Sequence, residues 1–228
     1  MKQLLLDFTH APAPTFANFV PGRNAELLGT LDAAVKGRNP ERVVYVWGEP
    51  GAGKTHLLKA FVHETAVRRS RFTPAADYAA GDSASLLAID DVEHLGESEQ
   101  VALFNAFNEG AFAFLLVSAQ AAPRDVGLRR DLATRLATGL TYRVLPLCDE
   151  EKRAALAAHA ASRGFALADE VASYLLTHAR RDMPSLIRAL DVLDRHSLET
   201  GRPITLPLLK AALQPADDLL AGAQGPRA

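Results

Sequence analysis

A glycine-rich segment that ends in lysine and threonine has the clearest chemical potential in the chain. Residues 48–55, GEPGAGKT, match the pattern G-x-x-x-x-G-K-[ST] of a phosphate-binding P-loop. Glycines let backbone N–H groups approach phosphate oxygens, and the N-terminus of a following helix adds partial positive charge. We expect Lys54 to reach the β- and γ-phosphates and the Thr55 hydroxyl to bind Mg²⁺. The residues predicted to line the nucleotide site here are Gly48, Pro50, Gly51, Ala52, Gly53, Lys54, Thr55 and His56.

Two carboxylates follow a second hydrophobic run, LLAI, at residues 86–89. A strand that ends in Asp90 and Asp91 fits a Walker B motif. In that interpretation Asp90 holds the Mg²⁺ shell and Asp91 orients the attacking water. The alternative is an ordinary acidic turn after a strand.

Further polar residues come after the next apolar run and on a basic stretch. Ser118 and Gln120 end the run at 114–117, where they can touch the γ-phosphate or simply solvate a strand end. Arg129, Arg130 and Arg135 lie on one predicted helix, and charge spacing alone does not choose among them.

Apolar runs and helical periodicity predict the elements that position these residues. Strands are expected at 43–47, 72–75, 85–89, 112–118 and 141–145, with helices at 55–69, 97–109 and 129–136. This alternation predicts an α/β fold, a parallel sheet flanked by helices. After Pro146 the pattern is purely helical, with helices at 149–163, 169–180, 184–200 and 207–213. Asp149 and Asp169 are the expected N-caps, and Gly164 and Gly201 the expected C-terminal breaks.

These patterns divide the chain into four segments. Residues 1–14 are expected to be a tail and linker, 15–147 an α/β domain, 148–213 a small α-helical lid and 214–228 a disordered tail. The 228 residues are 48% hydrophobic, so a sizeable core is expected, and the net charge of -2 gives no general basic surplus for nucleic acid. A single cysteine, Cys148, and the lack of a secretory or membrane-spanning run predict a cytoplasmic protein.

The motifs occur in the order of a known family. The P-loop, IDD at 89–91, SAQ at 118–120, DLATRL at 131–136 and a helical lid together resemble the DnaA/Hda family of AAA+ proteins over about 16–213. The resemblance implies ADP or ATP with Mg²⁺, and adenine covered by Phe19 and Val20 in the segment 16–22. It implies that Arg135 is a trans arginine finger acting with DnaA, and that Asp91, Gln120 and Ser118 are the other catalytic positions.

The N-terminal residues QLLLDF, 3–8, resemble the clamp-binding peptide of the Hda branch. Gln3, Leu4, Leu6 and Phe8 are then the contacts to the DNA polymerase III β sliding clamp; the alternative is an unspecific apolar stretch. No helix-turn-helix domain is expected after the lid, and few residues separate the second and third strands. DNA contact is therefore expected only through the clamp, and no membrane contact is expected.

One position departs from the family pattern. Pro184 stands where the resemblance places the sensor 2 arginine, and Arg180, Arg181 or Arg188 are the nearby substitutes. Weak intrinsic hydrolysis is therefore expected. The resemblance implies an Hda-like negative regulator of replication initiation that activates the ATPase of DnaA. The alternatives are a DnaC-like helicase loader, for which a segment of fourteen residues before the α/β domain is short, or a stand-alone AAA+ ATPase. The oligomeric state is left open, a homo-oligomer included.

Overall fold

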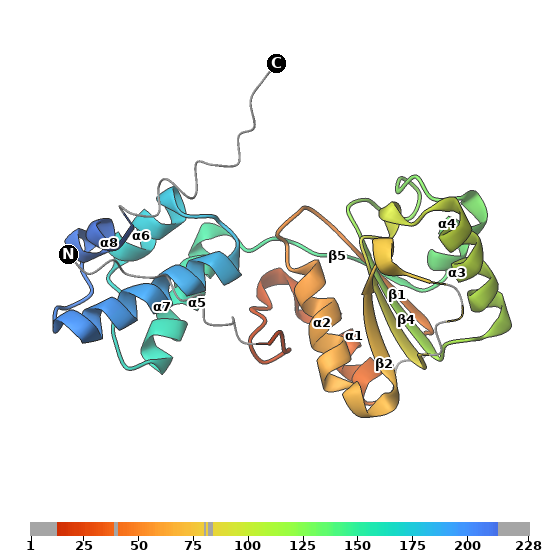
Figure 1. Cartoon of the computed structure of the whole chain (residues 1–228), viewed down its shortest axis with the longest axis horizontal. Coiled ribbons are helices and arrows are strands. Elements are labelled where there is room, and N and C mark those ends of the chain that lie inside the picture. The colour runs from red at the N-terminus through yellow and green to blue at the C-terminus, as the bar shows by residue number, and fades with distance from the viewer. Residues whose placement is uncertain (1–12, 39–40, 80, 82–83, 214–228) are drawn as a thin grey trace, which may run out of the picture. The chain divides into compact units, whose positions relative to one another are not determined.

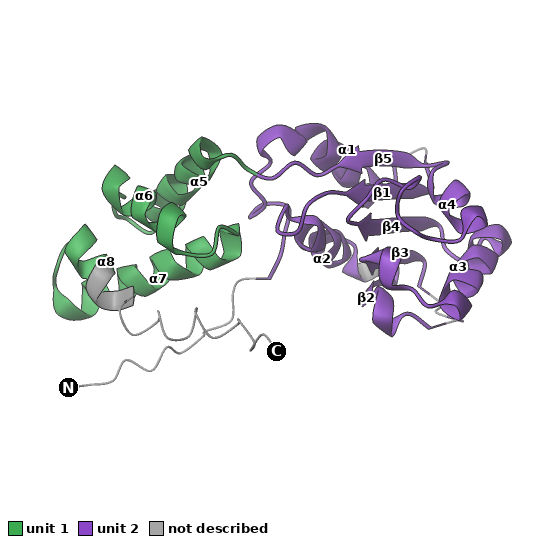
Figure 2. Cartoon of the chain, turned by 90° about the horizontal axis from the view of Figure 1, so that it is seen from above, with its two compact units in different colours: residues 1–11, 147–228 green, residues 12–146 purple. Residues whose placement is uncertain are grey.

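The computed structural model describes residues 13–38, 41–79, 81 and 84–213. The chain forms two compact units (Figure 2). One is Pro12–Pro146, and the described part of the other begins at Leu147. The predicted tails at 1–14 and 214–228, including the clamp-binding peptide, lie wholly or almost wholly outside the described residues.

The first unit is built on a five-stranded parallel sheet in the order β2-β3-β4-β1-β5. The strands are β1 (Val43–Trp47), β2 (Ser70–Pro74), β3 (Leu86–Asp90), β4 (Phe114–Ala119) and β5 (Leu140–Arg143). Every residue of β3 and β4 is buried, as expected for central strands covered on both faces. Pairing of Trp47 with Ala119 and of Ile89 with Val117 brings the carboxyl ends of β1, β3 and β4 to one edge.

Helices cover both faces of this sheet (Figure 1). On one face, α1 (Ala25–Val35) and α2 (Lys54–Glu64) pack their leucines and Phe61 against Val44, Val46 and Leu116. On the other, α3 (Glu97–Glu109) and α4 (Arg130–Leu136) share a core with the opposite sides of the same strands. The predicted parallel α/β architecture is confirmed.

The helix after the P-loop is shorter than predicted. It ends at Glu64 rather than near residue 69, because the Thr65 hydroxyl donates to the Phe61 carbonyl (2.7 Å) at its last turn. A short 3₁₀ helix, Ala66–Arg68, and Arg69 in the left-handed region (φ 56°) follow. The second strand therefore begins at Ser70, earlier than predicted.

The second unit is helical, as predicted. It contains α5 (Asp149–Ser162), α6 (Asp169–His178), α7 (Met183–Thr200) and α8 (Leu206–Leu213), and its core includes Leu156, Leu175, Leu186 and Leu190. Gly201 ends α7 in the left-handed region (φ 64°), as expected. The predicted N-caps were wrong by one residue: Cys148 and Ala168 occupy the cap positions, and Asp149 and Asp169 begin the first turns. Among the described residues, no helix is both long and apolar enough to cross a membrane.

Candidate functional site

The P-loop leads from β1 into α2 and closes around a buried lysine. Gly48 has φ 153°, and a Cβ there would lie 2.5 Å from the Val144 carbonyl oxygen, so only glycine fits. Gly53, at φ 103°, precedes the first residue of α2. The Lys54 side chain is only 6% exposed. Its Nζ donates to the carbonyl oxygens of Gly48 (2.8 Å) and Glu49 (3.2 Å), so the loop surrounds the ammonium group with its own acceptors.

Three predicted side chains meet at the carboxyl edge of the sheet. Thr55 Oγ1 donates to Asp90 Oδ2 (2.7 Å) across the gap between α2 and β3. Ser118 Oγ donates to Asp90 Oδ1 from β4, and it also accepts the Asp91 backbone N–H (2.8 Å). Ser118 is fully buried, and its only proton is used on Asp90. The Ser118 hydroxyl therefore holds both Asp90 and Asp91 in position.

Asp91 has an unusual backbone and an unusual charge environment. It lies in the left-handed region (φ 54°, ψ 58°), where a residue other than glycine is uncommon. Partial burial raises the pKa of its carboxyl, with the negative charges of Asp90 and Glu93 adding to the effect and Lys54 opposing it. A carboxyl whose pKa is raised at the end of a parallel strand is a candidate for proton or water chemistry.

Sequence reasoning missed Glu93. Its Oε1 accepts the backbone N–H of Gln120 (3.0 Å), which ties the loop after β4 to the turn after β3. Its Oε2 is buried and has no hydrogen-bond partner among the described residues. Gln120 itself is exposed. The only signal was the position of Glu93 two residues after the acidic pair.

The segment before α1 lies against the P-loop. Phe19 contacts the site of Gly53, where a Cβ would lie 3.0 Å from the ring, and its centroid is 5.6 Å from that of His56. A ring nitrogen of His56 lies 3.0 Å from the Thr15 carbonyl oxygen. Burial lowers the pKa of His56, and the bond to Thr15 opposes this. Val20 is half-buried, so the predicted adenine-side residues adjoin the loop.

The lid arginines have partners of their own. Arg181 pairs with Asp149, Arg180 lies 3.4 Å from Asp182, and Arg188 donates to the Ser185 hydroxyl (3.1 Å). Pro184 occupies the first turn of α7, where its missing N–H costs nothing. Each of the three arginines that could substitute for the sensor 2 arginine therefore contacts another residue of the lid.

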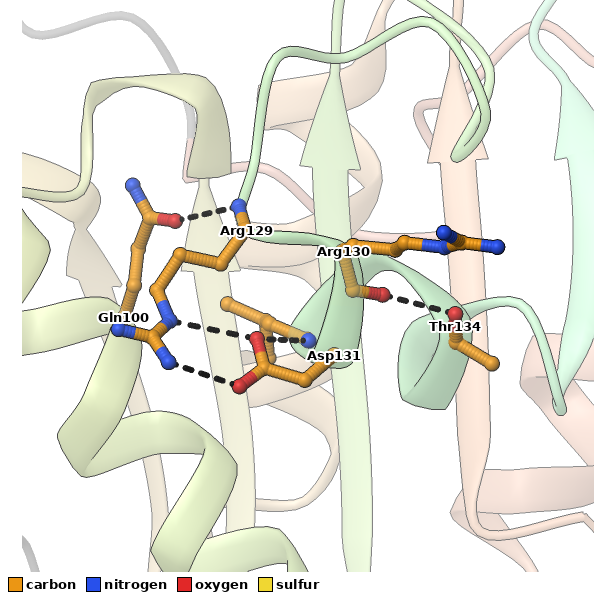
Figure 3. A network of polar contacts seen from close by, with 6 residues as sticks. Gln100, Arg129, Arg130, Asp131 and Thr134 are labelled. Carbon is orange, nitrogen blue, oxygen red and sulfur yellow. Dashed lines mark hydrogen bonds and ion pairs between the residues drawn. The ribbon is translucent and has the colours of Figure 1, made fainter.

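A second polar region lies on the other face of the sheet, between α3 and the start of α4 (Figure 3). Arg129 donates to both carboxylate oxygens of Asp131 (3.3 and 2.9 Å), and its backbone N–H donates to Gln100 Oε1 (2.8 Å). Gln100 is buried and also donates to the Leu95 carbonyl (2.9 Å). These bonds fix the beginning of α4 against α3.

The side chains here surround an open groove of about 670 Å³. We call it the arginine groove; its lining is Phe104, Arg129, Arg130, Asp131, Thr134 and Arg135. Arg135 is exposed, and its guanidinium carbon lies 6.0 Å from the Phe104 ring centroid and 5.9 Å from that of Phe107. Leu132 and Leu136, on the same helix, are fully buried. The helix is therefore anchored through its leucines while Arg135 faces outward.

Comparison with known proteins identifies the family. Residues 149–213 match the family model described as Hda, lid domain. A protein of Haemophilus influenzae, described as an uncharacterized protein, is 34% identical over 228 residues, covering 93% of this chain and 98% of that protein.

Solved structures share the fold. Domain III of the replication initiation protein DnaA from Thermotoga maritima has a TM-score of 0.70 and 21% identity, over 90% of this chain and 97% of that one. AMPPCP-bound DnaA from Aquifex aeolicus has a TM-score of 0.69 and 22% identity, over 94% and 72%. The RuvB Holliday junction branch migration motor of Thermotoga maritima has a TM-score of 0.64 and 19% identity, over 83% and 67%.

The P-loop, the strand order and the helical second unit define an AAA+ protein with a lid. The chain belongs to the Hda/DnaA-related family of AAA+ proteins.

Proposed function

We propose that this DnaA-related protein is an Hda-like negative regulator of chromosomal replication initiation. It binds adenine nucleotide, docks on the β sliding clamp and stimulates hydrolysis of the ATP held by DnaA. The observation that carries the proposal is Arg135: it is exposed in an open groove, forms no ion pair with any described residue, and rests on two aromatic rings. An arginine held this way is available to a charge supplied by another subunit.

The chain's own nucleotide site supports binding of ADP or ATP. The P-loop N–H groups and Lys54 would hold the phosphates, and Phe19 and Val20 would lie beside the adenine. Thr55 and Asp90 present a hydroxyl and a carboxylate 2.7 Å apart, which are ligand types that Mg²⁺ prefers. When bound, the ion would neutralise phosphate charge. Asp91 and Gln120 are the residues proposed to orient water, whereas Ser118 holds Asp90 and Asp91 in place.

The trans reaction would depend on Arg135. A guanidinium from a neighbouring subunit stabilises the charge that develops on the γ-phosphate oxygens, and this is worth about 10³–10⁵ in rate. Lysine would replace it poorly, since the planar fork of donors is lost. The arginine acts on the nucleotide of DnaA, so weak hydrolysis by this chain itself is compatible with the proposal.

Substitution of the finger is the decisive experiment. We expect Arg135→Ala to keep its fold and its nucleotide and yet to lose about 10³-fold or more of the stimulated ADP formation on DnaA, measured with clamp-loaded DNA. Arg124→Ala is the matched control, because Arg124 is exposed and lies outside the arginine groove. Stimulation by Arg135→Ala at the wild-type rate would refute the proposed function.

Clamp binding is proposed to reside in residues 3–8. Burial of Leu6 and Phe8 in an apolar pocket of the clamp would contribute about 1.5–3 kcal/mol each, with Gln3 making amide hydrogen bonds and Leu4 a further contact. We expect Leu6→Ala with Phe8→Ala to abolish clamp capture at micromolar protein and to leave nucleotide affinity unchanged. Wild-type clamp binding by the double variant, measured by surface plasmon resonance, would contradict the peptide assignment.

A further inference from the structure

Adjacent arginines at the start of α4 have different electrostatic states. The guanidinium of Arg129 is paired with Asp131 through two hydrogen bonds, so the two charges largely cancel. The Arg130 side chain makes no hydrogen bond or ion pair with any residue that the structure describes. Figure 3 shows the Arg130 guanidinium directed away from the Arg129–Asp131 pair. The sequence alone did not distinguish Arg129 from Arg130.

The backbone around Arg130 is nevertheless fixed. Its carbonyl oxygen accepts the Thr134 hydroxyl (2.7 Å), and the preceding residue is bonded to Gln100 of α3. Arg130 therefore has a free charge on an ordered base. Arg130 lines the same groove as Arg135, and the one carboxylate in that lining, Asp131, is bonded to Arg129, so neither Arg130 nor Arg135 has an ion-pair partner among the described residues.

Two unpaired arginines in one open pocket favour an anionic occupant with several acceptor oxygens. A guanidinium offers five donors in a planar fork, which suits the oxygens of a phosphate. We propose that Arg130 is a second phosphate-binding arginine, which contacts the γ-phosphate end of the ATP held by DnaA when Arg135 inserts there. The inference rests on the proposed function. In this proposal Arg130 contributes to affinity for the ATP-bound partner, and Arg135 contributes to the rate of ATP hydrolysis.

The test separates affinity from rate and triphosphate from diphosphate. Full-length Arg130→Gln is titrated against DnaA loaded with AMPPCP or with ADP, on clamp-loaded DNA, and the Kd is measured for each. We expect the Kd for the AMPPCP form to rise about tenfold, the loss of one charge-assisted contact. The Kd for the ADP form should change less than about twofold, and so should the maximal stimulated rate at saturating protein with ATP-loaded DnaA. Arg124→Gln serves as the exposed-arginine control and should leave all three values unchanged.

Other outcomes overturn the inference. An unchanged Kd would show that Arg130 is an ordinary solvent-facing charge. An equal loss with both nucleotides would place Arg130 against protein carboxylates rather than the γ-phosphate. A lower maximal rate at unchanged Kd would make it a residue of the chemical step. Arg135→Ala is measured in parallel. If it fails to stimulate hydrolysis while Arg130→Gln gives one of these outcomes, only the inference about Arg130 is wrong. If Arg135→Ala stimulates like the wild type, the proposed function itself is wrong.

Discussion

The P-loop site and the arginine groove differ in whether their charged side chains have partners within the protein. Around the P-loop, Lys54 donates to loop carbonyls, and the hydroxyls of Thr55 and Ser118 donate to Asp90. In the groove, Arg129 is paired internally, but Arg130 and Arg135 have no counter-ion among the described residues. The first site is organised by its own groups, whereas the second is left open to charge from outside.

This difference has a physical consequence for the two sites. A buried ammonium without acceptors would be costly, and the carbonyls of Gly48 and Glu49 supply those acceptors to Lys54. Exposed arginines carry no such cost, because water solvates them until a partner displaces it. The one acidic residue that lines the groove, Asp131, is bonded to Arg129, so it leaves Arg130 and Arg135 to the solvent.

The largest expected effect concerns the lysine of the internally organised site. Lys54→Ala should weaken ADP and ATP binding by about a hundredfold, because backbone N–H groups cannot replace a full charge beside the phosphates. Lys59→Ala is the control, since Lys59 lies exposed on the same helix. Isothermal titration calorimetry of the folded variants gives both affinities. Equal affinities for the two variants would mean that the P-loop does not bind nucleotide.

A smaller effect is expected for the hydroxyl that links the acidic pair. Ser118→Ala leaves Asp90 Oδ1 and the Asp91 N–H without that partner, and an unmet buried polar group costs about 1–3 kcal/mol. Urea unfolding should show this loss in the free energy of unfolding. Ser98→Ala removes an exposed hydroxyl and should cost less than about 0.5 kcal/mol. If both variants unfold at the same urea concentration, the buried network is not a stabilising unit.

The smallest effect probes the aromatic support of the groove. Phe107→Leu keeps most of the apolar volume and removes one ring face near Arg135, a contact worth about 0.5–1 kcal/mol at an exposed site. We expect a two- to fivefold lower stimulated rate on DnaA, roughly that energy expressed as a rate. Phe107→Tyr retains the ring and should restore the rate. No rescue by tyrosine would show that packing, not the ring face, is what Phe107 supplies.

Sequence patterns predicted the sheet and the P-loop because both depend on local residue order. Apolar runs marked β1, β3 and β4, and the strand-to-helix context marked the loop. Errors arose where a side chain bonds back to the backbone. Thr65 shortened α2 through its bond to Phe61, and the Glu151 carboxylate accepts the backbone N–H of Cys148, the residue that stands at the cap position of α5 in place of Asp149.

The contrast between Arg129 and Arg130 was beyond sequence reasoning. Arg129 bonds to the nearby Asp131, and its backbone N–H is held by Gln100, which lies on α3 far away in the chain. The role of Ser118 was likewise invisible, since its two bonds cross from β4 to the end of β3. Side-chain direction and tertiary partners, rather than residue type, separate these positions.

The left-handed backbone of Asp91 determines which replacement can report on its charge. Alanine at φ 54° would add conformational strain to the loss of the carboxylate, so its phenotype would mix two causes. Asparagine adopts this region readily and has nearly the same shape. Asp91→Asn thus removes the negative charge and keeps the side-chain shape. Asp91→Gly removes the whole side chain and keeps the backbone turn. Because of this torsion angle, the asparagine and glycine variants at residue 91 can be compared without added backbone strain.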